Sequence, residues 1–116
     1  MKIIYNKLIP IRGYLVINIF GTFFVRKRKD GSNPKLSDIT INHELIHTSQ
    51  MKEMLYVFFY IWYFIEWLVR LITNTKSAYY SISLEREAYI NSTNLEYLNN
   101  RKHFSWLKYL RIKNKN

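Results

Sequence analysis

The chain has 116 residues, the length of a single domain, and 48% of them are hydrophobic, which is enough for one modest core. It contains no cysteine, so both disulfide bonds and thiolate metal ligands are excluded. Lys and Arg outnumber Asp and Glu by 18 to 8, and the resulting net charge of +10 attracts anionic lipids or nucleic acids.

Two short apolar segments near the start of the chain predict strands. Segments 13–20 and 22–27 are rich in Val, Ile, Phe and Tyr, and Gly21 joins them; a basic loop, 26–34, ends the second. We expect either a hairpin that only covers the helices or a strand edge that binds an extended peptide above a functional site. The N-terminus lacks the apolar core of a secretory signal, so we expect no export by that route.

The most informative segment is 43–47, which reads His-Glu-Leu-Ile-His. Ser37 is a suitable N-cap for a helix through this segment. On a helix, His43 and His47 lie on one face about one turn apart and can bind a single metal ion, with Glu44 beside its open side. Zinc in such a site activates a water molecule, whose proton the glutamate accepts. The alternative is a solvated stripe on a polar helix.

Several hydrogen-bonding side chains surround the two histidines. They either orient the imidazole rings or form an ordinary wet surface. These residues are Asn42, Thr48, Ser49 and Gln50.

No Gly or Pro ends the helix after the motif. A straight helix reaching Thr73 would place that residue about 39 Å from His47, whereas segment 74–84 spans at most about 36 Å when fully extended. The chain could then not return to the histidines. We therefore expect the helix to end or bend somewhere in segment 49–55, although no residue there explains a break.

Segment 54–72 begins with twelve apolar or aromatic residues in a row and contains only two charged residues, Glu66 and Arg70, spaced to form an ion pair. Three locations fit this composition. The segment is a helix buried in the core or in a homodimer interface, a helix lying in an anionic membrane surface, or a transmembrane span. Tyr and Trp favour an interface over the centre of a bilayer.

A zinc site of this kind needs a third protein ligand. Glu66 would lie about 28 Å from His47 along a straight helix, which excludes it unless the helix bends sharply. Glu85 follows the polar segment 73–77, where the chain can turn back towards the histidines. Glu87 points to a different face of the same helix from Glu85, so only one of the two should bind the metal.

Segments 43–47 and 85–88, the latter reading Glu-Arg-Glu-Ala, together resemble the gluzincin clan of zinc metallopeptidases. In compact and membrane-bound members, a second helix carries Glu-x-x-Ala-Asp, and its first Glu is the third ligand. The chain as a whole also looks like a set of small uncharacterised bacterial proteins of the metallopeptidase type. The resemblance implies Zn²⁺ bound by His43, His47 and Glu85, with Glu44 as the catalytic base.

Tyr89 departs from the gluzincin pattern, because it stands where those enzymes have an Asp that orients a ligand histidine. We expect the tyrosine hydroxyl to accept this hydrogen bond instead. The oxyanion of the reaction also needs a donor. The candidates are Tyr89, Tyr79, Tyr80 and His103.

Segment 104–113 mixes aromatic, aliphatic and basic residues and predicts a basic C-terminal helix, either at a membrane surface or packed on the core. We expect one compact, mostly helical α+β domain of the zincin type, with a strand-rich start over 1–36, as a hairpin or short sheet, and helices over 37–116.

The expected function is zinc-dependent hydrolysis of a peptide or protein substrate. The alternative is a membrane-surface or interaction protein whose metal site is structural or inactive. No nucleic-acid-binding signature is present, so we expect no such partner. The expected location is the cytoplasm, with the inner face of the membrane as the site of any lipid contact.

Overall fold

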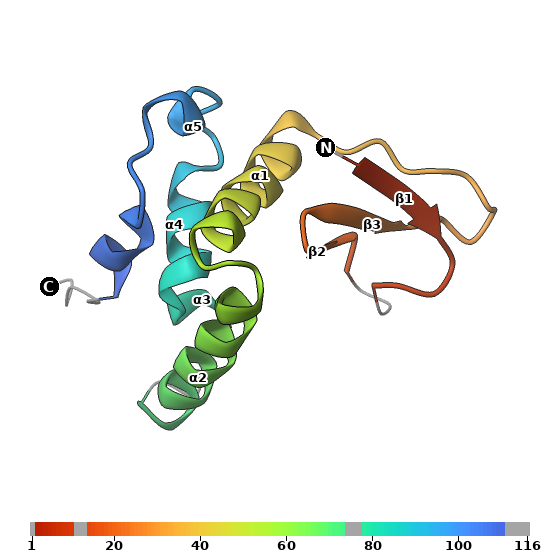
Figure 1. The fold of residues 1–116 in the computed structure, drawn as a ribbon. Helices are drawn as coiled ribbons and strands as arrows, with labels where there is room; N and C mark the ends of the chain where they lie inside the picture. Colours follow the sequence, from red (N-terminus) through yellow and green to blue (C-terminus); the bar gives the residue numbers. More distant parts are fainter. Residues whose placement is uncertain (1, 11–13, 74–77, 111–116) are drawn as a thin grey trace, which may run out of the picture.

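The computed structural model describes residues 2–10, 14–73 and 78–110 and has an α+β fold, in agreement with the predicted class (Figure 1). The strands are β1 (Lys2–Asn6), β2 (Val16–Ile19) and β3 (Thr22–Arg26). The helices are α1 (Asp38–Glu53), α2 (Val57–Thr73), α3 (Ala78–Ser81), α4 (Ser83–Asn91) and α5 (Tyr97–Asn100), followed by the short 3-10 helix η2 (Ser105–Tyr109). The sheet lies to one side of the helices.

The predicted hairpin is present as β2 and β3, and β1 extends it to a three-stranded sheet in the order β1-β3-β2. The β1 strand is parallel to β3, whereas β2 is antiparallel to it. Phe20 and Gly21 both have positive φ, at 51° and 90°, which is the backbone of a two-residue hairpin turn that matches strand twist. The central strand buries Phe23 and Val25 in a small core with Leu36. In this strand order β2 is an edge strand, and it lies beside α1.

The motif helix begins where the sequence predicts. The side chain of Ser37 accepts a hydrogen bond from the backbone N–H of Thr40 at 3.1 Å, so it caps α1. The helix then runs without interruption to Glu53. Both motif histidines therefore lie on regular helix.

The predicted break after the motif is confirmed, since α1 and α2 are joined at an angle of 108°. Leu55 and Tyr56 form the turn with left-handed backbone conformations, at φ 54° and 61°. The N–H of Tyr56 donates to the carbonyl of Met51 at 2.7 Å, which closes the end of α1. The helix thus ends through the left-handed conformation of Leu55 and Tyr56, without a Gly or Pro.

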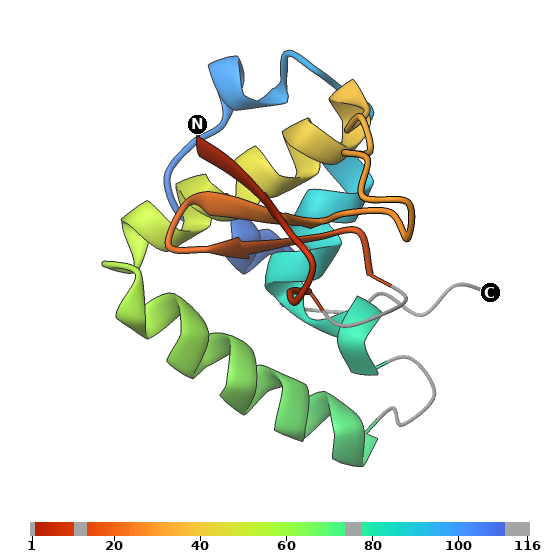
Figure 2. The same cartoon turned by 90° about the vertical axis from the view of Figure 1, so that its right-hand side faces the viewer.

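Figure 2 shows that α2 begins near the C-terminal end of α1 and runs below the sheet. Its buried residues are Phe59 and Glu66, and Phe59 joins a second core with Met51 and Leu84. Among the described residues, no single helix has the length and hydropathy to cross a membrane; α1 and α2 meet that test only as a bent pair.

The C-terminal prediction is wrong in part. The described portion of segment 104–113 forms the 3-10 helix η2, with Phe104 in the left-handed region at φ 60°, instead of a regular α-helix. Trp106 is buried against Trp62, with ring centroids 5.4 Å apart. This packing supports the core interpretation for the segment, and residues 111–116 lie outside the described part of the chain.

Candidate metal centre

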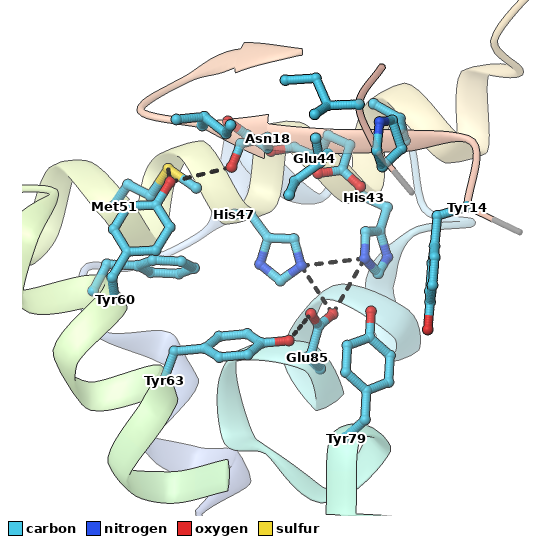
Figure 3. A pocket seen from close by; sticks show the side chains of 16 residues that line it. Tyr14, Asn18, His43, Glu44, His47, Met51, Tyr60, Tyr63, Tyr79 and Glu85 are labelled. Atoms are coloured by element: carbon cyan, nitrogen blue, oxygen red, sulfur yellow. Dashed lines mark hydrogen bonds and ion pairs between the residues drawn. The ribbon is translucent and has the colours of Figure 1, made fainter. Parts of the chain in front are cut away.

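Three side chains from two helices meet at the face of α1 that looks towards α4. His43 and His47 extend from α1 and Glu85 extends from α4 to meet them (Figure 3). The Nε2 atoms of the two histidines are 3.2 Å apart. The Glu85 Oε1 atom lies 2.9 Å from Nε2 of His47 and 3.4 Å from Nε2 of His43. The three residues singled out in the sequence as ligands are thus brought together.

The spacing of these three atoms fits one tetrahedral metal ion. Zinc binds nitrogen and oxygen ligands at about 2.0–2.2 Å, so two tetrahedral ligand atoms lie about 3.3–3.5 Å apart. The contacts among the ligand atoms of His43, His47 and Glu85, at 2.9 to 3.4 Å, are within a few tenths of an ångström of that spacing. Two neutral imidazoles and a carboxylate form a donor set that zinc accepts. The residues present therefore fit the ion that the motif implies.

Glu66, the other candidate for the third ligand, lies at the N-terminus of α4 and not beside the histidines. Its carboxylate accepts hydrogen bonds from the backbone N–H and the hydroxyl of Ser83, at 2.8 and 2.5 Å, at the first residue of α4. Arg70 pairs with it at 3.1 Å, as the i, i+4 spacing predicts. A carboxylate at a helix N-terminus is favourable because it complements the helix dipole. Glu66 thereby fixes the start of the helix that carries Glu85.

The charges of the site are strongly coupled. Burial by itself lowers the pKa of His47, but the adjacent Glu85 carboxylate outweighs it and raises this pKa to about 9. Burial raises the pKa of Glu85, but the charge of His47 and hydrogen bonds from the neighbouring side chains hold that pKa well below its usual range. Burial raises the pKa of Glu44, with the two histidines opposing it. Glu44 is consequently a stronger base than a surface carboxylate.

The outer nitrogen of His47 is held by Gln50, whose Oε1 lies 2.8 Å from Nδ1. The amide nitrogen of Gln50 donates to the carbonyl of Leu84 and to the Glu87 carboxylate, at 3.0 and 2.9 Å. These two acceptors fix the orientation of the amide, so its oxygen faces the imidazole. An N–H at Nδ1 then donates to Gln50, so Nε2 is the nitrogen that faces Glu85 and would bind a metal.

The Tyr89 hydroxyl does not take the histidine-orienting role expected for it. It lies 3.3 Å from the Tyr79 hydroxyl, while the Tyr89 ring packs edge-on against His43 at a centroid distance of 4.4 Å. The outer nitrogen of His47 is met instead by Gln50, which lies one helical turn away on α1 itself.

The structure places the candidate oxyanion donors at different distances from the site. Tyr79 lines the cavity beside His43, His47 and Glu85, whereas Tyr80 is outside the cavity lining and packs on the rings of Tyr79 and Tyr89. His103 is not at the site. Its side chain is 90% exposed and lies next to Glu53, at the far end of α1.

Tyr63 contributes a contact that was not predicted. Its hydroxyl donates to Glu85 Oε2 at 2.6 Å, so both carboxylate oxygens of Glu85 are engaged. Burial and the Glu85 charge raise the pKa of Tyr63, which keeps it a donor. This contact could not be predicted from the sequence, because Tyr63 is one of several aromatic residues in a row on α2.

A cavity of about 600 Å³ opens beside the cluster. Its walls are β2, the motif face of α1, and the inner face of α2. Asn18 fastens the first two walls together by donating to the Glu44 carbonyl and the Thr48 hydroxyl, both at 2.9 Å. Tyr60 fastens the third wall, because its hydroxyl donates to the Asn18 carbonyl and accepts from the N–H of Phe20. These hydrogen bonds therefore connect the three walls of the cavity to one another.

Comparison with known protein families, with curated proteins and with solved structures gave no match to this chain.

Proposed function

We propose that this protein is a zinc-dependent hydrolase of the metallopeptidase type. The observation that carries the proposal is the convergence of His43, His47 and Glu85 at the spacing of tetrahedral ligands, next to a buried glutamate and an open cavity. A zinc ion held there supplies a polarised water of pKa near ~7 and a Lewis acid for a carbonyl group. The resemblance of the two motifs to gluzincins supports peptides as substrates.

Glu44 is the proposed general base. It directly follows a ligand histidine and lines the cavity. Its raised pKa brings its basicity closer to working pH, which improves proton transfer from the attacking water and later to the leaving amine.

Tyr79 is the proposed oxyanion donor. Burial, then the Glu85 charge, raise its pKa, so its hydroxyl keeps its proton, and that hydroxyl points towards the metal-binding cluster in Figure 3. A fixed donor aimed at developing negative charge stabilises the transition state.

The free edge of β2 is the proposed place for the substrate backbone. Val16 and Ile17 lie along the cavity on β2, one of the two edge strands of the sheet. An edge strand offers unpaired N–H and C=O groups, which an extended peptide satisfies by adding as a further strand.

The test is the metal content and activity of protein purified without added zinc. We expect close to one zinc per chain in the native protein, and His47→Ala and Glu85→Gln should each lower occupancy sharply because a ligand is lost. His103→Ala and Glu96→Gln are the matched controls, since these residues lie outside the site, and should keep the metal. Element analysis by mass spectrometry gives the occupancy.

Glu44→Gln separates binding from catalysis in the same experiment. It should retain zinc and lose cleavage of a mixed peptide library. Loss of zinc from Glu66→Gln but not from Glu85→Gln would overturn the ligand assignment. Tight zinc binding with no cleavage by the native protein would favour the alternative function, a membrane-surface or interaction protein with an inactive metal site.

A further inference from the structure

The outer face of α2 is apolar and turned away from the protein. We define it as the nine large apolar side chains between Val57 and Ile72 that are more than a third exposed. At about 100° per residue, all nine project within an arc of about 160°. The opposite side carries the buried Phe59 and the Glu66–Arg70 ion pair. A helix on a water-soluble surface has the reverse arrangement, with its polar face outward.

The charged groups of the protein are distributed unequally between interior and surface. Of its eight acidic residues, five have their carboxylates in the interior, which leaves Asp30, Asp38 and Glu96 as the exposed acids. The inward-facing acids are Glu44, Glu53, Glu66, Glu85 and Glu87. Among the described basic residues, eight are exposed, so the exposed charge of the described surface is predominantly positive. They are Lys2, Lys7, Arg28, Lys29, Lys35, Lys52, Lys102 and Lys108.

Exposed lysines also flank α2. Lys52 precedes the turn into the helix, and Lys108 lies on η2, which packs on α2 through the contact of Trp106 with Trp62. The molecule therefore presents an apolar face together with a strongly basic surface.

We propose that the outer face of α2 docks in the plane of an anionic lipid surface. An apolar face of about 25 Å in length matches a helix that lies at the boundary between headgroups and acyl chains, and anionic headgroups complement the basic surface. A second copy of the chain is a poorer occupant. It would bring two charges of +10 together, and the arc of the outer face contains no polar side chain to set a register.

Docking would place the cavity close to the lipid. The inner face of α2 contributes Phe59, Tyr60 and Tyr63 to the cavity wall, so one helix diameter, about 10 Å, separates the cavity from the docked face. If the proposed hydrolase function holds, its substrates are then peptide segments at the membrane surface. Vesicle binding itself does not depend on that function.

The experiment measures binding of the full chain to vesicles of phosphatidylcholine with phosphatidylglycerol, and of phosphatidylcholine alone, by co-sedimentation. We expect binding to the anionic vesicles that is about tenfold or more tighter and that weakens as salt rises. Ile61→Glu/Ile65→Glu should weaken it by about tenfold or more, because two inserted side chains are lost. Phe64→Ser, a milder change on the same face, should act in the same direction.

The control is Ile39→Glu/Leu95→Glu, which makes the same charge change at two exposed apolar residues away from α2. The control should bind clearly better than the α2 variant. Equal binding of the two would show attraction by charge alone and overturn docking through α2. A native dimer in light scattering that ignores vesicles and is dissociated by Phe64→Ser would overturn the lipid proposal in favour of a second copy.

Discussion

Gln50 links the proposed metal site to the buried charges behind it. Its oxygen faces His47 and its nitrogen faces the Glu87 carboxylate, which itself accepts hydrogen bonds from Arg101 and Tyr97. The His47 ring is therefore oriented by a neutral amide that is in turn held by a buried carboxylate.

We predict that Gln50→Leu lowers zinc affinity by about 10 to 100-fold, because the ligand ring loses the partner that fixes its tautomer and angle. Competition with a chromophoric chelator measures the change. Tyr89→Phe is the comparison: its hydroxyl contacts Tyr79, so affinity should change little. A large loss in Tyr89→Phe together with none in Gln50→Leu would restore the role first expected for Tyr89.

The histidine pair could be predicted because i, i+4 spacing on a helix fixes which side chains share a face. The role of Gln50 could not be decided from the sequence. Its orientation depends on the Leu84 carbonyl and Glu87, both more than thirty residues away along the chain. Tyr63 was missed for the same reason, since its partner Glu85 lies on another helix.

At the scale of elements, the turn between α1 and α2 stores strain. Leu55 has a positive φ of 54° and its side chain is 70% exposed, so little packing compensates for its backbone conformation. An L-residue in the left-handed region costs roughly 1–2 kcal/mol relative to glycine. The turn is nevertheless required, because it brings α2 back over the cavity.

We predict that Leu55→Gly raises the free energy of unfolding by about 0.5–1 kcal/mol, as relief of strain exceeds the entropy that glycine adds to the unfolded chain. Urea denaturation measures the change. Leu55→Ala removes the same side chain without relieving φ and should not be stabilising. Equal stability of the two variants would mean that the turn is not strained at this residue.

The existence of this break was predictable from the length of a helix and the reach of an extended chain. A straight helix would put Glu85 out of reach of His47. Its cause was not, since Leu55 and Tyr56 have no preference for left-handed backbone. Strand β1 shows a similar limit. It pairs with β3, whose residues lie about twenty positions later in the chain. The local sequence pattern predicted only a strand-rich start and could not show this pairing.

On the scale of the whole molecule, Arg101 joins the C-terminal segment to both site helices. It pairs with Glu53 of α1 at 2.8 Å and with Glu87 of α4 at 2.5 Å, and all three side chains are at most 5% exposed. Charge patterning could not reveal this, because the two glutamates lie 48 and 14 residues from the arginine. In the sequence they are merely three charges in a basic chain.

We predict that Arg101→Met lowers the free energy of unfolding by about 3–5 kcal/mol, because it leaves two carboxylates buried without a counter-charge. Urea denaturation at neutral pH measures it, with Arg28→Met, an exposed arginine, as the control expected to stay within about 0.5 kcal/mol. Adding Glu53→Gln and Glu87→Gln to Arg101→Met should recover part of the loss, since the uncompensated charges are then gone. No recovery in the triple variant would mean that the arginine acts through packing alone. A loss below about 1 kcal/mol in Arg101→Met would show that solvent reaches these carboxylates, and that the C-terminal segment is not fastened to the site helices by charge.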